Sequence, residues 1–302
     1  MPSARINGVT LHYEEVGEGT PIVFVHEFAG EAQSWHLQVR FFARRYRTLA
    51  FNARGYPPSE VPEAPAAYSQ PLAVEDIRGL LDHLAIERAH ICGLSMGGYA
   101  TLHFGLTYPE RARSLTVAGA GYGSGADRQD FQRDVKHVVR QFEEGGMARV
   151  AEFYTKGPTR VQFTSKDPTG WREFFDLFAA GSAIGHALTM RGVQLTRPSI
   201  LDLGPRLERL EVPTLVVTGD EDDPCLEPAI FMKRKIRTAG LLVIPNAGHT
   251  INLEEPDLFN RALLDFLTAV DAGRWPTRLP GAQTGSAILP GGPVAKPSEG
   301  RA

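Results

Sequence analysis

Cysteine is scarce in this chain, whose 302 residues contain only Cys92 and Cys225. Two cysteines are too few for a disulfide framework, and Cys92 lies in an apolar run that predicts a small buried side chain. The formal net charge is only −3, so the chain lacks the basic surface that nucleic acid or an anionic membrane would require. These absences exclude a disulfide-rich scaffold and argue against nucleic-acid binding.

Long apolar runs are absent too. No run reaches the length of a membrane span, and residues 1–8 lack the apolar core of a secretion signal. The composition, 42% hydrophobic and 22% charged, is that of an ordinary globular protein. We therefore expect a cytoplasmic protein, monomeric or homodimeric, whose partner is a small molecule rather than a nucleic acid or a membrane.

What the chain does contain is an alternation of apolar runs and helical periods. Residues 4–7 and 9–16 predict a pair of strands that a turn connects. The apolar runs that predict buried parallel strands are 21–25, 47–51, 89–92, 114–118, 214–218 and 240–244. The helical periods between and after them are 34–42, 74–84, 99–108, 227–238 and 256–270. This alternation predicts a parallel sheet with helices on both faces.

One long segment interrupts the alternation. Residues 121–205 carry no buried strand but four helical stretches, at 131–144, 148–154, 171–180 and 186–193. We expect this segment to lie as a cap over the carboxyl ends of the strands, where ligands of open α/β sheets bind. The predicted organisation is a core domain of residues 1–120 and 206–272, a helical cap of 121–205, and a disordered tail of 273–302 rich in Pro, Gly and Ser.

The most informative motif is Gly-Leu-Ser-Met-Gly-Gly at residues 93–98. It follows an apolar run and precedes a helical stretch, so it predicts a strand, a sharp turn and a helix with Ser95 at the apex. Small neighbours are needed because such a turn strains the serine backbone. With 31 glycines in the chain the pattern also arises by chance, and a solvated serine in a glycine-rich turn is the alternative. In context, the motif indicates a nucleophile beside a helix N-terminus.

A base and a carboxylate follow in compatible positions. His249 comes after the run 240–244, and the acids of residues 220–223 come after the run 214–218. Because parallel strands end at one edge of the sheet, these groups are expected near Ser95. An imidazole can take the serine proton while a carboxylate orients it. We predict Asp222 as that carboxylate, with Asp220 and Asp223 as alternatives.

Together these motifs resemble the α/β-hydrolase superfamily, in its serine-nucleophile branch with a helical cap, over residues 5–270. The resemblance rests on residues 93–98, 219–222, 248–249, 52–55 and on His26. It implies an eight-stranded, mostly parallel sheet with helices on both faces and a cap inserted after strand six. The acid of this family usually stands three residues after the glycine, which selects Asp222.

An oxyanion hole commonly uses two backbone N–H groups. Met96, the residue after the nucleophile, would supply one, and the resemblance suggests Phe28 for the other. Glu27 departs from the family, which usually has glycine there. We expect its side chain to pair with an arginine such as Arg54 or to face solvent, rather than to act near the histidine or the substrate. His26 is expected to have a structural hydrogen-bonding role.

The expected reaction is hydrolysis of a carboxylic ester or lactone through an acyl-enzyme, without cofactor or metal, since no His/Asp/Glu cluster has ligand spacing. Carbon–carbon hydrolysis of a ring-cleavage product, with Asn52 or Arg191 holding a carboxylate or enolate, is an alternative. Halide-dependent or perhydrolase chemistry and a receptor with little turnover are others. The apolar cap residues predict a hydrophobic substrate. Candidate substrate-binding residues are Glu27, Tyr154, Phe178, Met190 and Arg191.

Overall fold

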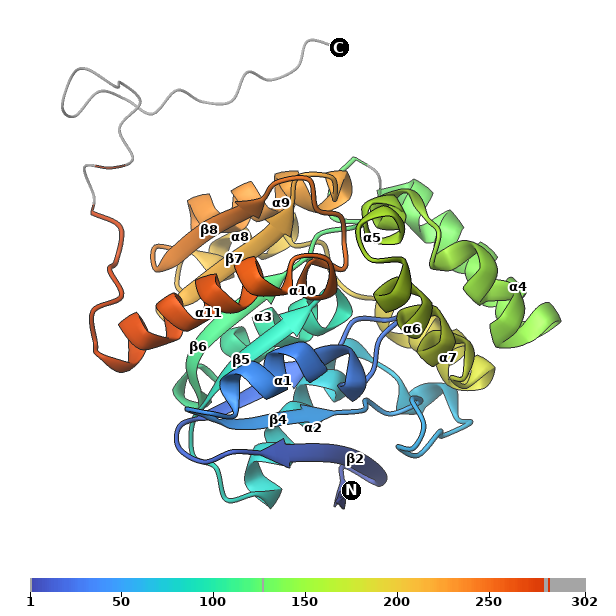
Figure 1. Ribbon diagram of the computed structural model, residues 1–302, viewed down its shortest axis with the longest axis horizontal. Coiled ribbons are helices and arrows are strands. Elements are labelled where there is room, and N and C mark those ends of the chain that lie inside the picture. Colours follow the sequence, from blue (N-terminus) through green and yellow to red (C-terminus); the bar gives the residue numbers. More distant parts are fainter. Residues whose placement is uncertain (1, 127, 280–281, 283–302) are drawn as a thin grey trace, which may run out of the picture.

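The computed structural model describes residues 2–126, 128–279 and 282, and eight strands form its central sheet (Figure 1). The strands are β1 (Ser3–Ile6), β2 (Val9–Val16), β3 (Pro21–Val25), β4 (Arg47–Phe51), β5 (Ala89–Leu94), β6 (Ala112–Ala118), β7 (Thr214–Gly219) and β8 (Ala239–Ile244). They lie in the order β1-β2-β4-β3-β5-β6-β7-β8. Only the pairings of β2 with β1 and β4 are antiparallel. The predicted eight-stranded, mostly parallel sheet is therefore confirmed.

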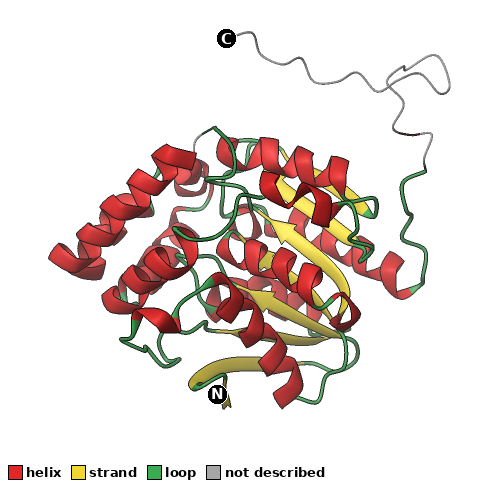
Figure 2. Ribbon diagram, turned by 180° about the vertical axis from the view of Figure 1, so that it is seen from behind, coloured by secondary structure: helices red, strands yellow, loops and turns green. Residues whose placement is uncertain are grey.

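Helices cover both faces of this sheet (Figure 2). They are α1 (His36–Phe42), α2 (Gln70–His83), α3 (Met96–Thr107), α9 (Asp223–Lys235), α10 (Ile251–Glu254) and α11 (Pro256–Asp271). In β3, Val23 and Val25 share an apolar cluster with α2, α3 and α9, whereas Ile22 and Phe24 pack with α1 and α11. Burial on both faces explains why this strand is a continuous apolar run. In the described chain no helix is both long and apolar enough to cross a membrane.

Between β6 and β7 the described residues form helices and turns without a strand. We call this segment, residues 121–205, the helical insert. Its elements are α4 (Arg128–Tyr154), η4 (Pro158–Arg160), α5 (Val161–Lys166), α6 (Pro168–Ala179), α7 (Ala183–Thr189), η5 (Met190–Gln194) and η6 (Leu201–Leu203), and α8 (Gly204–Leu207) follows at its end. Figure 1 shows α4 to α7 grouped beside one end of the sheet. Their apolar cluster includes Phe28, three residues after β3, and Met96, two residues after β5, so the insert covers the carboxyl ends of the strands.

The predicted helices agree with this arrangement except at some of their ends. The two stretches expected at 131–144 and 148–154 lie within α4, whose helical path breaks at Gly146 with φ 68°. α9 begins at Asp223 rather than at residue 227. α5 and α10 were not predicted, because six and four residues are too few to display a helical period.

The expected boundary of the tail at residue 273 is wrong. Trp275 Nε1 donates a hydrogen bond to the carbonyl of Thr238 at 2.7 Å. Its ring packs edge-on against Phe266 with the centroids 4.6 Å apart. An isolated aromatic residue in a polar segment gives no periodic signal, so its packing was missed. Residues 280, 281 and 283–302 of the predicted tail lie outside the described residues.

Candidate active site

Ser95 occupies a strained turn between β5 and α3. Its φ of 56° and ψ of −111° are sparsely populated for a residue with a side chain, and its N–H donates to the Ala118 carbonyl at 2.8 Å. A Cβ on Gly97 would lie 2.6 Å from the carbonyl carbon of Val25 and 2.7 Å from the carbonyl oxygen of His26. Only glycine fits there, so the spacing of the motif follows from the close approach of α3 to the end of β3.

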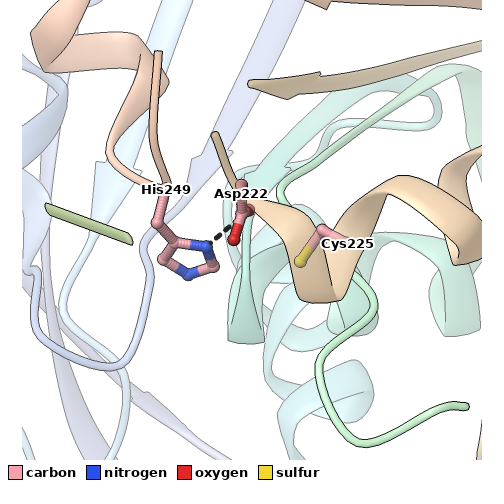
Figure 3. Close-up of side chains that lie close together, drawn as sticks. All are labelled: Asp222, Cys225 and His249. Carbon is pink, nitrogen blue, oxygen red and sulfur yellow. Dashed lines mark hydrogen bonds and ion pairs between the residues drawn. The ribbon is translucent and has the colours of Figure 1, made fainter. Parts of the chain in front are cut away.

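Asp222 and His249 form a buried pair. His249 Nδ1 lies 2.8 Å from Asp222 Oδ2, and the two side chains are 10% and 2% exposed (Figure 3). With Nδ1 donating to the carboxylate, Nε2 is the ring nitrogen that can accept a proton. Burial lowers the pKa of His249, but the charge of Asp222 and its hydrogen bond raise it, and the net effect is a raised pKa. The alternatives Asp220 and Asp223 are exposed.

The sheet brings Ser95 to the same edge as this pair. Ser95 follows β5, Asp222 follows β7 and His249 follows β8, and β5 to β8 are adjacent parallel strands. Gly119, at the end of β6, lies between them, since a Cβ there would be 3.0 Å from Leu94 Cδ1 and 3.5 Å from His249 Cε1. Among the described residues, Ser95 and His249 are not hydrogen-bonded to each other. The strand topology places both residues at the same edge of the sheet. Hydrogen bonds between a nucleophile and its base often form fully only when substrate is bound.

The loop after β3 carries Phe28 to the start of α3. Met96 is the first residue of that helix, and Phe28 and Met96 belong to the same apolar cluster. The Tyr56 hydroxyl donates to the Phe28 carbonyl at 3.0 Å, and Gly30 N–H donates to the Glu27 carbonyl at 3.1 Å. These bonds hold the loop that contains the expected second N–H donor.

His26 has the hydrogen bonds expected of a structural residue. Its Nε2 accepts from the N–H of Ala53 at 3.0 Å, so its Nδ1 is the nitrogen that donates to the Glu27 carbonyl, at 2.6 Å. Complete burial lowers the pKa of His26 to about 4, so the ring is neutral at pH 7. The histidine therefore ties the loop after β3 to the loop after β4.

The expected pairing of Glu27 with Arg54 is wrong. Arg54 binds Asp76 with both Nε and Nη2 at 2.7 Å, whereas Glu27 Oε2 lies 2.5 Å from Arg160 Nη2. Glu27 and Arg160 are 1% and 6% exposed at their side chains. Arg160 belongs to η4 of the helical insert, and the N–H of His249 donates to the carbonyl of its neighbour Thr159 at 2.7 Å. No local pattern marks Arg160, because its partner is 133 positions away.

The other predicted substrate-binding residues divide into two groups. Tyr154, Phe178 and Met190 belong to or pack against the apolar cluster that contains Phe28 and Met96. Arg191 does not reach it: its guanidinium pairs with Glu143 at 2.5 Å, with side chains 50% and 44% exposed. The prediction for Arg191 is therefore wrong, because α7 and η5 turn this position outward.

Asn52, the other residue expected to hold the substrate's carboxylate or enolate, also makes its hydrogen bonds within the protein. Its amide nitrogen donates to Glu31 Oε2 at 3.1 Å and to the Pro57 carbonyl at 2.7 Å, and its oxygen accepts from the Ala32 N–H at 2.9 Å. The side chain is buried and organises the loops around it.

Sequence spacing did not reveal a cluster that the fold brings together. Polar atoms of Asp222, Cys225 and His249 lie within 4.8 Å of one another (Figure 3). Burial, and next the charge and hydrogen bond of Asp222, raise the pKa of the Cys225 thiol well above its usual range. A cation would need the thiolate and would compete for the oxygen that already binds His249. The cluster fits an acid–base pair with a protonated thiol beside it. Asp222 and Cys225 are three positions apart at the start of α9, but His249 joins them only in the folded chain.

Comparison with known proteins agrees with the fold. The sequence profile of the "Alpha/beta hydrolase family" matches residues 22–262. The chain belongs to the alpha/beta hydrolase family. It is 27% identical over 258 residues to 3-oxoadipate enol-lactonase 2 of Acinetobacter baylyi, an alignment that covers 84% of this chain and 92% of the relative. It is 26% identical over 276 residues to 2-hydroxy-6-oxo-6-phenylhexa-2,4-dienoate hydrolase of Comamonas testosteroni, with 85% and 91% covered.

Among solved structures, a thermophilic esterase from Thermogutta terrifontis, with malate bound, superimposes with a TM-score of 0.79 at 25% identity. That superposition covers 89% of this chain and 99% of the esterase. These relatives are hydrolases: an enol-lactonase, a dienoate hydrolase and an esterase.

Proposed function

We propose that this protein hydrolyses carboxylic esters or lactones, with Ser95 as nucleophile, His249 as general base and acid, and Asp222 as the group that orients the imidazole. The observation that carries the proposal is the buried hydrogen bond between His249 Nδ1 and Asp222 Oδ2 at the sheet edge that also carries the strained Ser95. The similarity to a lactonase and an esterase supports the same reaction class.

The proposed reaction has two steps. His249 Nε2 takes the proton of Ser95 as Oγ attacks the carbonyl carbon, and the protonated imidazole then gives this proton to the leaving alcohol oxygen. In the second step a water loses its proton to Nε2 and attacks the acyl-enzyme, and the acid leaves as Ser95 recovers its proton. Asp222 stays ionised and stabilises the imidazolium in both steps.

Developing charge on the carbonyl oxygen would be stabilised by the N–H groups of Met96 and Phe28. Met96 begins α3, where unpaired N–H groups and the helix dipole favour negative charge. Phe28 lies on a loop whose carbonyl groups are already held by Tyr56 and Gly30. Each preorganised donor of this kind contributes about 3 kcal/mol to stabilising the transition state.

The substrate is expected to be largely hydrophobic. Phe178 and Met190 supply buried apolar surface beside Phe28, and the Tyr154 and Phe28 rings lie 5.5 Å apart. Glu27 adds one polar feature, because its buried Oε1 has no hydrogen-bond partner in the described structure. A hydroxyl or N–H group of the substrate could donate to that oxygen.

Carbon–carbon bond hydrolysis is the second candidate, because the chain is similar to the Comamonas testosteroni hydrolase over most of both lengths. Both groups that the sequence suggests for the substrate's carboxylate or enolate, Asn52 and Arg191, bind other residues of the protein. The ester and lactone reaction is therefore the better-supported proposal.

Labelling and turnover together test the proposal. We expect a fluorophosphonate to label the folded protein at Ser95, and Ser95→Ala to abolish both labelling and hydrolysis of short-chain aryl esters and lactones. Absence of labelling at Ser95 in folded protein would refute the nucleophile. Turnover of a ring-cleavage dienoate, with none of any ester or lactone, would replace the proposed reaction with the second candidate.

A further inference from the structure

Glu27 and Arg160 form a buried ion pair that joins the helical insert to the loop after β3. Glu27 Oε2 accepts a hydrogen bond from Arg160 Nη2 at 2.5 Å, and both side chains are almost wholly buried. The guanidinium also lies over the rings of Tyr154 and Phe174, 5.0 and 5.7 Å from their centroids. The pair is therefore held by its ion-pair contact and by both aromatic rings.

Each member of the pair adjoins a residue of the candidate active site. Glu27 immediately precedes Phe28, the expected oxyanion donor. Arg160 immediately follows Thr159, whose carbonyl accepts the backbone N–H of His249 at 2.7 Å. A Cβ on Gly248 would lie 3.0 Å from the Thr159 carbonyl carbon, so η4 packs closely on the histidine loop. The pair thus connects the two loops that carry His249 and Phe28.

The charges of the pair also act on His249. The negative charge of Glu27 raises the pKa of His249, and the positive charge of Arg160 lowers it. Asp222 and the Cys225 thiol face the imidazole from α9 and the turn before it, and Glu254 faces it from α10. The titratable and charged groups around His249 and the pair are Asp222, Cys225, Glu27, Arg160, Glu254, Lys166 and Tyr154.

We infer that Glu27 and Arg160 are positioning residues for the proposed reaction: they hold η4 against the histidine loop, and they balance each other's charge beside the imidazole. This inference rests on the proposed function. Glu27 and Arg160 act through His249 and Phe28, since neither needs to touch the reacting atoms. The balance matters because the imidazole gains a positive charge during the reaction, in a site from which water is largely excluded.

Removing each of the two charges should shift the pKa of His249 in opposite directions. Glu27→Gln removes a negative charge and leaves Arg160 unneutralised, so the pKa of His249 falls. Arg160→Met removes the positive charge and leaves Glu27, so the pKa of His249 rises. Each shift is expected to be about half to one pH unit at this range in a partly shielded interior. Both variants break the same contact, so a merely structural role would change the two in the same direction.

The experiment follows the His249 ring by NMR titration in the Ser95→Ala background, with its resonance assigned by comparison with a His249→Gln variant. The expected result is a lower titration midpoint in Glu27→Gln and a higher one in Arg160→Met. In the same two variants with Ser95 intact, the pH at which kcat/KM falls on the acidic side should shift in the same directions. Shifts of the same sign, or no shift in either variant, would overturn the inference. The titration needs no turnover, so it separates failure of this inference from failure of the proposed reaction.

Matched controls come from the exposed pair of the same insert, Glu143 and Arg191. Glu143→Gln and Arg191→Met remove the same charges at exposed positions that do not act on His249, and neither should move its midpoint. If a single variant of the buried pair does not fold, the double variant Glu27→Gln/Arg160→Met carries the test. It should keep a midpoint near that of the parent while kcat/KM falls about tenfold at its optimum, because η4 is no longer held. Full kcat/KM in a folded double variant would overturn the inference.

Discussion

Gly97→Ala is the substitution that most directly tests how the turn around Ser95 is built. The added Cβ would lie 2.6 Å from the carbonyl carbon of Val25 and 2.7 Å from the carbonyl oxygen of His26. Both neighbours are backbone atoms, so no side chain can rotate away. Either the end of β3 or the first turn of α3 has to retreat by about 1 Å to restore van der Waals contact.

That displacement has two expected consequences. Overpacking of a tight core contact lowers the free energy of unfolding by about 1–3 kcal/mol, measurable as a lower midpoint in urea. The displaced atoms also belong to the chain that carries Phe28 on one side and Met96 on the other. A shift of about 1 Å between proposed oxyanion donors should lower kcat on an aryl ester by about 100-fold, with KM changing much less.

Gly105→Ala is the matched control, on the same helix and equally buried. The three atoms nearest to its Cβ would all belong to the side chain of Leu115, and Gly105 lies more than two helical turns from Ser95. We expect it to change the urea midpoint while kcat stays within about threefold of the parent. If Gly97→Ala kept the parental kcat, or Gly105→Ala lowered kcat as much, the argument from backbone contact at the turn would be refuted.

Three further outcomes follow from the buried groups. Asp222→Asn should lower kcat by about 10⁴-fold on an aryl ester, because it disfavours the required tautomer of His249, and a loss below tenfold would contradict its role. Because the pKa of His249 is raised above 6.5, a plot of kcat/KM against pH should show the base protonating, and activity falling by half, at a pH above 6.5. A half-maximal pH below 6 would contradict that direction. Glu27→Gln and Arg160→Met should each lower the free energy of unfolding by about 3–5 kcal/mol, since each leaves a buried charge unpaired. In urea the double variant should lose less than the sum of the two, and strict additivity would show that the pair is not coupled.

Local patterns were sufficient for most of the fold. The run 21–25 appears as β3, and the break expected between two helices of the insert falls at Gly146. Ser95, Asp222 and His249 each come soon after a predicted parallel strand. Because parallel strands end at one edge of the sheet, these positions already predicted a common edge. Short elements such as α10 escaped detection, because four residues contain about one helical turn and no period. The packing of Trp275 was missed because a single side chain carries no pattern.

By itself, the sequence determined the strained turn at Ser95, its glycine neighbours and the sheet edge that receives Asp222 and His249. These features depend on backbone sterics and on the place of each motif directly after an apolar run, and local sequence specifies both. Only the tertiary structure decided that Glu27 binds Arg160 rather than Arg54 and that Arg191 faces outward. Those outcomes depend on how a helical insert lies on loops that are distant in the chain, and side-chain charge alone does not specify which opposite charge will be within reach.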